Sequence, residues 1–384
     1  MGPTNSILIN HKKRSFFLIA LFLCPFFTQT SSFANWEYFR GNPSCHGVSN
    51  SKLSQPLELL WKFKTKKKIL SSAVCNDKLV FFGCNDHHLY ALGKTNGKLA
   101  WSFKANGRVE SSPLILNGRI YFGSNDNYFY CLDIENGKLI WKIETDDKVI
   151  GAANAYTIKQ ETNIVFGSYD NHLYCVDPST GKIKWKFKSE NYINGSPSIS
   201  KGKIAFGGCD EKVHLINGEN GERISQINLK NYIAGTGAFE GDKLYIGHYG
   251  NKLAAIDLKH SKILWEYESD DSPFFSSPAL TSDKLYIGSR DKYLHCIDKK
   301  SGKAIWKYRA KGSVDSSPVV CDNKVVFASE DGFITIVDSL TGKKIWSYEC
   351  GSSISASVCI SDGKIFIGAD DKTFRAFGSI LKKK

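Results

Sequence analysis

The sequence lacks the short motifs that identify several common kinds of enzyme. It contains no GxSxG, no phosphate-binding loop of the GxxxxGK[ST] type and no HExxH, so nothing points to a serine hydrolase, a P-loop nucleotide hydrolase or a zinc metalloprotease. It also has no CxxC pair, and Cys45-His46 lacks the upstream cysteine that covalent haem attachment requires. Function therefore has to be sought outside these motifs.

Long apolar runs are also scarce. The one such segment, residues 16–27, follows the basic residues 12–14, and it is shorter than the roughly 20 residues needed to cross a bilayer. Residues 32–34, Ser-Phe-Ala, supply the small side chains that signal peptidase recognises. We therefore expect a signal peptide at residues 1–34 and an extracytoplasmic mature chain. Lipidation at Cys24 is an alternative, which the bulky Leu23 before it disfavours.

Acidic residues are outnumbered, and the formal net charge is +13. Three basic residues lie within the expected signal peptide, which leaves +10 on the mature chain. Much of this charge comes from lysines that recur about once in every 40 residues, and an even distribution favours a soluble surface over a nucleic-acid groove. These lysines are Lys98, Lys138, Lys182, Lys262, Lys303 and Lys343.

Ten of the eleven cysteines follow the expected signal peptide, and no two are adjacent. Their spacing assigns no disulfide pairing. Cys131, Cys175 and Cys296 occupy a position that alanine fills elsewhere in the internal repeat described below, so we expect small packing residues there. Another three cysteines recur at nearly one position late in a strand, namely Cys75, Cys321 and Cys359.

The sequence does contain an internal repeat, marked by tryptophan. Seven of the eight tryptophans follow a stride of 40 to 44 residues, with Ser225 in the one empty slot. A period in this range is typical of propellers and solenoids. The seven are Trp61, Trp101, Trp141, Trp185, Trp265, Trp306 and Trp346.

One unit, residues 101–141, is expected to contain four strands. The turn at Asn117-Gly118 is typical of a tight hairpin, and Asp126 is expected to cap the next turn, because it recurs in seven of the eight units. The expected strands are 111–116, 119–123, 128–133 and 138–143. Eight such units predict an all-β, eight-bladed propeller of four-stranded antiparallel blades.

The two ends of the chain are expected to complete one blade. The last unit ends near Leu381 without its outer tryptophan strand, while residues 57–61 precede the first unit without a partner. Pairing them would close the ring and remove two exposed sheet edges. The predicted organisation is a signal peptide at 1–34, a lead-in and closing strand at 35–60, and the propeller at 61–384.

The spacing within each unit is a small residue, five residues, glycine, three residues and tryptophan, as in Cys131, Gly137 and Trp141. This resembles the tryptophan-docking motif of the β-propeller repeat family named after pyrroloquinoline quinone (PQQ). Residues 36–47, WEYFRGNPSCHG, resemble the lead-in of that family. The resemblance implies that each indole packs between blades. Because Ser225 replaces one indole, and the larger Leu215 stands at the small position of that unit, we expect the blade-four junction to be the weakest.

The resemblance implies three unlike functions. Quinoprotein dehydrogenases hold PQQ and Ca²⁺ over the axis, frequently beneath adjacent cysteines. BamB-type factors for outer-membrane protein assembly hold no cofactor and dock on the barrel-inserting complex. Other members are sensor or ligand-binding ectodomains. This chain lacks both the adjacent cysteines and the extra loops of the dehydrogenases, which favours a non-catalytic, BamB-like scaffold in the periplasm or secreted, with envelope proteins such as the barrel assembly complex as partners.

Residues just before the innermost strands are expected to surround the funnel mouth. They are Leu70, Glu110, Ile150, Asn194, Ala234, Phe275, Asp315 and Ile354. Only two are charged, whereas PQQ with Ca²⁺ requires several convergent oxygen ligands and a cation. We therefore expect no cofactor, no metal and no catalytic residue. If a quinone site exists, Glu110, Asn194 and Asp315 are its candidates.

Two positions earlier lies an arc of cations followed by aromatic residues. Its members are Lys68, Arg108, Lys148, Tyr192 and Tyr232. They predict a rim that binds an acidic or aromatic segment of a partner protein. The alternative is a set of exposed residues with no binding role.

Overall fold

The computed structural model describes residues 1–2 and 35–379 of the chain. The chain divides into two units, Met1–Ser32 and Phe33–Lys384, and every described strand belongs to the second. The expected signal peptide beyond residue 2, its cleavage site and Cys24 lie outside the described residues, as do residues 380–384. Among the residues that are described, no helix is long and apolar enough to span a membrane.

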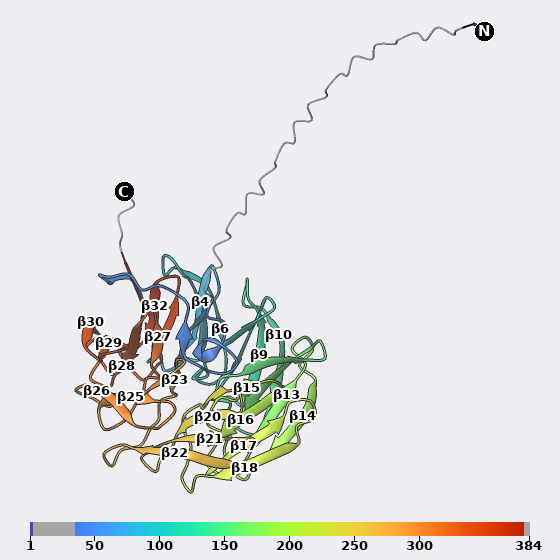
Figure 1. Ribbon diagram of the computed structural model, residues 1–384. Helices are drawn as coiled ribbons and strands as arrows, with labels where there is room; N and C mark the ends of the chain where they lie inside the picture. The colour runs from blue at the N-terminus through green and yellow to red at the C-terminus, as the bar shows by residue number, and fades with distance from the viewer. Residues whose placement is uncertain (3–34, 380–384) are drawn as a thin grey trace. The chain divides into compact units, whose positions relative to one another are not determined.

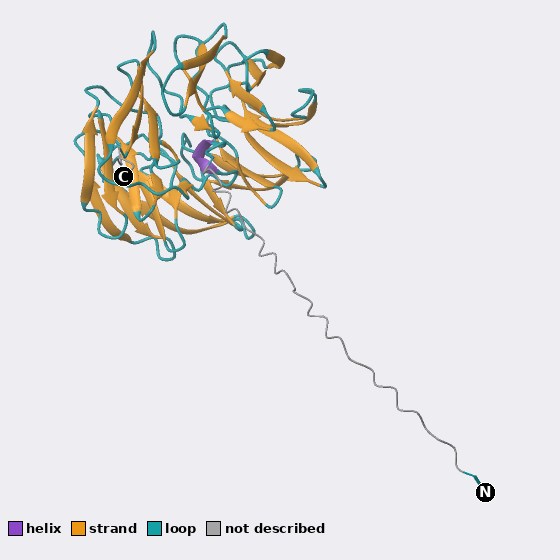
Figure 2. Cartoon of the chain, turned by 90° about the horizontal axis from the view of Figure 1, so that it is seen from above, coloured by secondary structure: helices purple, strands orange, loops and turns teal. Residues whose placement is uncertain are grey.

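The second unit is an eight-bladed β-propeller, as predicted (Figures 1 and 2). Blade one contains β3 (Val74–Cys75), β4 (Leu79–Gly83), β5 (His88–Gly93) and β6 (Leu99–Lys104). Blade two contains β7 (Leu114–Leu116), β8 (Arg119–Gly123), β9 (Tyr128–Asp133) and β10 (Leu139–Glu144). Blade three contains β11 (Asn154–Ile158), β12 (Glu161–Gly167), β13 (His172–Val176) and β14 (Ile183–Lys188). Blade four contains β15 (Ser198–Ser200), β16 (Lys203–Gly207), β17 (Lys212–Asn217) and β18 (Arg223–Asn228).

The other four blades repeat this order. Blade five contains β19 (Ala238–Glu240), β20 (Lys243–Gly247), β21 (Lys252–Asp257) and β22 (Lys262–Glu268). Blade six contains β23 (Ala279–Leu280), β24 (Lys284–Gly288), β25 (Tyr293–Asp298) and β26 (Ala304–Arg309). Blade seven contains β27 (Val319–Cys321), β28 (Lys324–Ala328), β29 (Phe333–Asp338) and β30 (Lys344–Glu349), joined by β1 (Val48–Ser49). Blade eight contains β31 (Cys359–Ser361), β32 (Lys364–Gly368), β33 (Thr373–Gly378) and β2 (Glu58–Lys64).

In blade two the two middle strands have the predicted bounds, and the outer strand is shifted by one residue. The innermost strand is shorter than predicted. Ser111 and Ser112 precede β7 because they bond the neighbouring blades: the Ser111 hydroxyl donates to the Gly151 carbonyl at 3.0 Å, and the Ser112 hydroxyl accepts from the Ser72 amide at 3.0 Å. The hairpin at Asn117-Gly118 is confirmed, with φ of 50° and 72°.

The predicted role of Asp126 as a hairpin cap is confirmed. Its carboxylate accepts from the backbone N–H of Tyr128 at 3.2 Å, from the Tyr130 hydroxyl at 2.8 Å and from the backbone N–H of Asn106 at 2.8 Å. These bonds tie the turn to the third strand and to the loop that leads into the blade. The carboxylate is therefore occupied by structural donors.

Each tryptophan docks on the next blade. The Trp101 indole donates to the Ile134 carbonyl at 2.9 Å, and its ring covers Gly137, where a Cβ would lie 2.5 Å from Cε3. Gly137 also has φ +70°, which favours glycine. The other indoles donate in the same way to the carbonyls of Lys94, Pro178, Gly218, Lys299, Ser339 and Leu57. The motif is thus an indole packed on glycine at six of the eight junctions. The two others are the junction of Trp346, which donates to the Leu57 carbonyl, and that of Ser225.

At its junction Ser225 keeps the polar half of this contact. Its hydroxyl donates to the Leu258 carbonyl at 3.4 Å, the bond that an indole makes elsewhere. The apolar half is supplied by Leu215, which pairs with Ser225 across the strands and is buried in the same core as Leu258. That this junction is the weakest stays a prediction.

The predicted closure by an N-terminal strand is confirmed. β2 pairs antiparallel with β33 and places Trp61 opposite Ala376, so the blue strand lies beside the red sheet in Figure 1. The indole of Trp346 donates to the Leu57 carbonyl at 3.2 Å, so the closing segment also receives the docking contact from blade seven. β33 is therefore not left as the outer edge of a three-stranded blade.

A Trp101→Ala substitution should lower the free energy of unfolding by about 3–5 kcal/mol, because it empties the space over Gly137. Ser225→Ala should cost about 1 kcal/mol, because it removes one hydroxyl hydrogen bond. Denaturant unfolding of both variants beside the parent chain measures the two costs. Equal costs would show that the indole contact is not what holds the blades together.

Candidate functional site

The lead-in passes through the centre of the ring. We call residues 36–49 the axial segment. Its carbonyls accept the edge N–H groups of innermost strands: Cys75 donates to Trp36 at 2.9 Å, and Ile115 donates to Glu37 at 2.9 Å. Four further blades do the same through Ile199, Phe239, Leu280 and Val320, at 2.8 to 2.9 Å. The axial segment thus covers strand edges that would otherwise face an open channel.

Arg40 anchors the axial segment. Its side chain is 1 % exposed, and its guanidinium donates to the carbonyls of Ser317 at 3.2 Å and Pro318 at 2.6 Å. It also reaches the carbonyls of Ser277 and Pro278, in the adjacent blade. A buried arginine with carbonyl partners is costly to replace, because those acceptors would lose a charged donor.

The sequence predicted neither the covering of the strand edges nor the anchoring by Arg40. The lead-in was recognised only by its resemblance to the family. The signals that were present are Gly41 and Gly47, both at positive φ. A Cβ at Gly47 would lie 2.0 Å from the Arg40 guanidinium. Only glycine at position 47 therefore leaves room for the Arg40 guanidinium to approach the backbone this closely.

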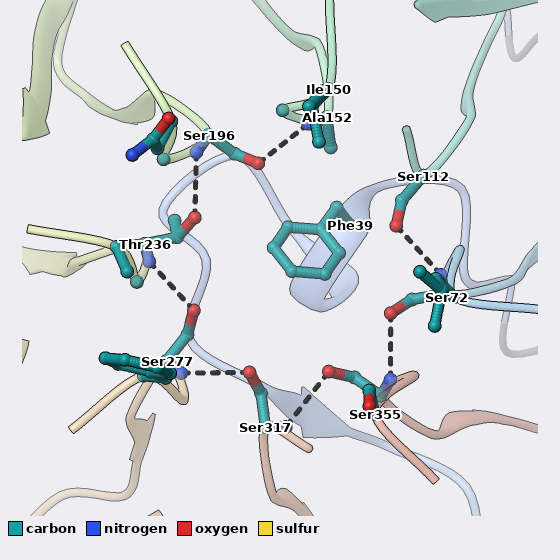
Figure 3. A pocket seen from close by; sticks show the side chains of 18 of the residues that line it. Phe39, Ser72, Ser112, Ile150, Ala152, Ser196, Thr236, Ser277, Ser317 and Ser355 are labelled. Carbon is teal, nitrogen blue, oxygen red and sulfur yellow. Dashed lines mark hydrogen bonds between the residues drawn. The ribbon is translucent and has the colours of Figure 1, made fainter. Parts of the chain in front are cut away.

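Above the axial segment the ring encloses a cavity of about 190 Å³, and Phe39 projects into its centre (Figure 3). Seven of the eight residues predicted at the funnel mouth line it. They are Leu70, Glu110, Ile150, Asn194, Ala234, Phe275 and Asp315.

Ile354 was predicted at the funnel mouth, and that prediction is wrong. Ile354 is fully buried, and Ser355 lines the cavity in its place. Ser357 is the counterpart of Ser317, since both hydroxyls accept the backbone N–H of the preceding blade. The innermost strand of blade eight therefore starts one residue later than was counted, and Ile354 takes the interblade packing position that Val314 holds in blade seven.

A belt of hydroxyl groups surrounds the cavity. In seven of the eight blades a serine or threonine hydroxyl accepts a backbone N–H from the blade before it, at 2.9 to 3.0 Å (Figure 3). The acceptors are Ser112, Ser196, Thr236, Ser277, Ser317, Ser357 and Ser72. Ala152 breaks the belt in blade three. The hydroxyls serve the contact between blades.

The polar groups at the mouth also have partners. Arg290 binds the Asp315 carboxylate at 2.8 Å and lies 3.7 Å over the Phe275 ring. Glu110 lies 3.8 Å from Arg108. The Asn194 side-chain amide donates to the Cys209 sulfur at 2.9 Å, while its Oδ1 has no protein partner. Burial raises the pKa of Cys209, which keeps this thiol protonated.

These residues do not fit PQQ with Ca²⁺. Glu110 lies on blade two and Asp315 on blade seven, and the second is already neutralised by Arg290. Within residues 35–379 no group of three His, Cys, Asp or Glu side chains could hold a metal ion. The cavity is also smaller than the roughly 300 Å³ at which ligand pockets begin. The three candidates for a quinone site line one cavity.

Around this mouth lie two further sets of side chains, which we call the rim. In every blade an N–H of the outer set donates to a carbonyl of the inner set, at 2.9 to 3.2 Å. The inner set is Lys68, Arg108, Lys148, Tyr192, Tyr232, Pro273, Ser313 and Ser353. The outer set is Asn85, Asn125, Tyr169, Cys209, Tyr249, Arg290, Glu330 and Asp370. The five residues predicted to bind a partner therefore lie together on one face.

The rim has a basic sector. Lys68 and Arg108 are exposed, and with Lys67 and Lys372 they surround a second cavity of about 580 Å³. Asp370 is the one acidic residue on its wall. Exposed cations around a concave surface attract acidic partners, and more strongly at low ionic strength.

An aromatic sector follows the basic one. Lys148 Nζ lies 4.4 Å from the Tyr169 ring, which stacks on Tyr192 at 5.1 Å. Tyr232 meets Tyr249 at 6.1 Å, and Tyr249 meets Phe275 at 4.5 Å. The exposed fractions of Tyr192, Tyr232 and Tyr249 are 45 %, 50 % and 44 %. Tyrosines exposed in this number are typical of protein interfaces.

Two of the five aromatic residues in this sector were not predicted from the sequence. Tyr169 and Tyr249 belong to the outer set, in the hairpin turns between the second and third strands. Their signal is a tyrosine at the turn position that asparagine holds in Asn85 and Asn125. Only the fold shows that these turns lie beside the loops that carry Tyr192 and Tyr232.

Comparisons with known proteins give the fold a family. A family model described as "Beta-alanine-activating enzyme, beta-propeller" matches residues 152–364, more than half of the chain. A second, described as "Outer membrane protein assembly factor BamB", matches residues 58–157. No curated protein sequence matches.

Solved structures with this fold have diverse functions. BamB from Moraxella catarrhalis has a TM-score of 0.70 and 14 % identity, covering 86 % of this chain and 99 % of its own. The quinohemoprotein alcohol dehydrogenase ADHIIG from Pseudomonas putida HK5 has a TM-score of 0.73 and 12 % identity, and the match covers 91 % of this chain and 81 % of the dehydrogenase. The computationally designed Ika8 protein has a TM-score of 0.73 and 15 % identity, and the match covers 84 % of this chain and 100 % of the designed chain. At these identities the likeness is one of fold.

An Arg40→Ala substitution should lower the free energy of unfolding by about 3 kcal/mol, because the carbonyls it binds lose a charged donor. Arg40→Lys should cost less, since it keeps the charge with fewer donors. Arg108→Ala, at the exposed rim, is the matched control and should change stability by about 0.5 kcal/mol or less. Thermal unfolding of the three variants measures this order, and an Arg40→Ala variant as stable as Arg108→Ala would contradict the anchoring role.

Proposed function

The chain belongs to the PQQ-like β-propeller family, and from that premise we propose that it is a non-catalytic, extracytoplasmic scaffold that binds other envelope proteins through its rim. The rim is the observation that carries the proposal. It places a basic sector beside an aromatic sector on one face of a rigid ring. The partner that fits such a surface is a protein segment with acidic and aromatic side chains.

The axial cavity supports a binding role over catalysis. Phe39 fills its centre, its hydroxyl belt is bonded to backbone, and Asp315 is paired with Arg290. Chemistry on a bound substrate needs groups that are free to act on it. The mouth of this cavity offers mainly packing and structural hydrogen bonds.

A role in outer-membrane protein assembly is the specific form of this proposal. It is supported by the similarity of residues 58–157 to the BamB family model and by the BamB-like ring. The chain would then act in the periplasm or as a secreted protein, peripheral to the outer membrane, with the barrel assembly complex as its partner. A sensor or ligand-binding ectodomain would use the same rim.

Reversing the charge of three rim cations tests the proposal. The triple variant Lys68→Glu, Arg108→Glu and Lys148→Glu should bind a purified barrel-assembly subunit from the same envelope at least about tenfold more weakly at low salt. The control is Lys98→Glu, Lys138→Glu and Lys182→Glu, which makes the same charge change at exposed residues of the same blades. Those three lie in turns between third and fourth strands, at the opposite end of each blade.

The control should bind within about twofold of the parent chain, measured by biolayer interferometry. Equal losses in both triple variants would show a general charge effect instead of a rim site. Unchanged binding by the first variant would remove the rim from the proposal. A parent chain that binds no assembly subunit would leave the sensor as the better function.

A quinoprotein dehydrogenase is the second candidate, because its fold is shared with ADHIIG. The full chain titrated with PQQ and Ca²⁺ should show no saturable change in quinone absorbance and no dye-linked oxidation of alcohols or sugars. Saturable binding that is lost in Asp315→Ala would overturn the scaffold proposal. Asp331→Ala, in a nearby turn outside the cavity lining, is the matched control for that variant.

A further inference from the structure

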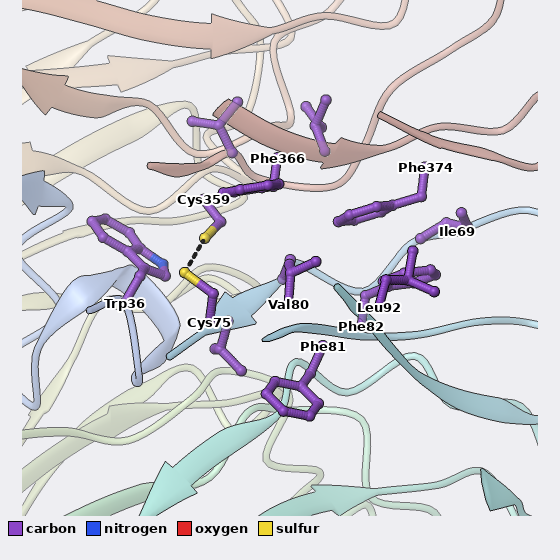
Figure 4. Packing of buried hydrophobic residues seen from close by; sticks show 14 of the residues in the cluster. Trp36, Ile69, Cys75, Val80, Phe81, Phe82, Leu92, Cys359, Phe366 and Phe374 are labelled. Atoms are coloured by element: carbon purple, nitrogen blue, oxygen red, sulfur yellow. Dashed lines mark hydrogen bonds between the residues drawn. The ribbon is translucent and has the colours of Figure 1, made fainter. Parts of the chain in front are cut away.

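Two cysteines face each other across the seam where the ring closes. Cys75 lies on β3 of blade one, and Cys359 lies on β31 of blade eight. Their sulfur atoms are 3.7 Å apart, both side chains are fully buried, and Trp36 of the axial segment lies beside them (Figure 4). The pair plays no part in the rim or the axial cavity.

Strand register shows that this pairing is particular to one seam. Cys359 pairs with Phe366 as Val74 pairs with Phe81, so it holds the position of Val74 and Val319 in their blades. Cys75 pairs with Val80 as Val320 pairs with Val325, which places it in the position of Val320 and Ile360. At the other seams within residues 35–379, no pair of cysteines occupies these two facing positions. At the seam between blades seven and eight, for example, the two residues are Val319 and Ile360. Packing alone therefore requires only aliphatic side chains.

This seam is also the place where the two ends of the propeller meet. Blade eight is assembled from both ends of the propeller, and β2 supplies the one covalent connection between it and blade one. Without β2, contacts such as the Lys94–Asp362 ion pair at 2.6 Å would have to hold the seam. A covalent bond between β3 and β31 would close the ring whether or not β2 is docked.

We propose that Cys75 and Cys359 form a disulfide that locks the ring at this seam. The oxidant is an external disulfide, either oxidised glutathione or an oxidised protein dithiol. One thiolate attacks that disulfide and releases the first thiol, and the second cysteine then attacks the mixed disulfide and releases the other thiol. Two cysteine thiols lose two electrons and two protons, and the external disulfide gains both.

The packed seam has two opposing effects on the Cys75 thiol. Burial opposes its ionisation, but the hydrogen bond with Cys359 and the positive charge of Lys94 lower its pKa. Lys94 Nζ is buried at the seam, where it also donates to the Ser361 hydroxyl at 2.8 Å. Because both sulfurs are shielded from solvent, exchange has to occur before the seam has packed, during folding.

The experiment refolds the full chain in a glutathione redox buffer and in a fully reducing buffer. After the thiols are blocked, mass spectrometry of the peptides should find Cys75 linked to Cys359 in the oxidised sample, with two fewer free thiols. The oxidised chain should unfold roughly 5 °C above the reduced chain, because the bond closes a loop of nearly the whole propeller. Refolding in vitro makes the result independent of the predicted export and of what the rim binds.

Two variants separate the disulfide from ordinary packing. The double variant Cys75→Val and Cys359→Val carries the type of side chain that other blades have at these positions, and its unfolding temperature should not depend on the redox buffer. Cys131→Ala removes a buried thiol on β9 and should keep the full redox shift. A chain that refolds in the oxidising buffer with both thiols free, or with either linked to another cysteine, would overturn the proposal, and this result on the parent chain stands even if a variant fails to fold.

Discussion

The contact on which the whole ring depends is an indole lying on a glycine of the next blade. Each indole adds a hydrogen bond to a carbonyl beside that glycine, so the contact is both apolar and directional. Six of the eight junctions contain this contact, so it recurs round most of the ring. At Ser225 the hydrogen bond to the next blade is kept without an indole, and Leu215 supplies the apolar surface instead.

A ring built in this way leaves a hole at its axis, lined by unpaired strand edges. The axial segment solves this problem with backbone alone, since its carbonyls accept N–H groups from six blades. Arg40 and the hydroxyl belt then bond the remaining polar groups around the hole. Many of the polar groups at the axis are therefore bonded to the protein itself, although the Asn194 Oδ1 is not. The rim, by contrast, keeps cations and tyrosines exposed.

The rim and the seam differ in what they offer a partner. The rim is a surface on which side chains vary from blade to blade while the backbone repeats, so partner recognition can change without loss of fold. The Cys75–Cys359 contact affects only how firmly the ring stays closed. A closed ring would hold the basic and aromatic sectors at fixed spacing, which is what a scaffold requires.

The sequence by itself determined the repeat, the number of blades, the docking tryptophans and the closing strand, because each depends on a spacing that recurs along the chain. It also predicted seven of the eight residues at the funnel mouth. It failed at Ile354, because the serine-rich loop of blade eight makes Ser355 resemble Ser316, whereas Ala356 holds that position in the fold. Only the tertiary structure showed that Tyr169 and Tyr249 join Tyr192 and Tyr232, that Arg40 is buried among carbonyls and that Cys75 meets Cys359. These contacts join residues from different blades or from the two ends of the propeller, and strand periodicity carries no information about such distances.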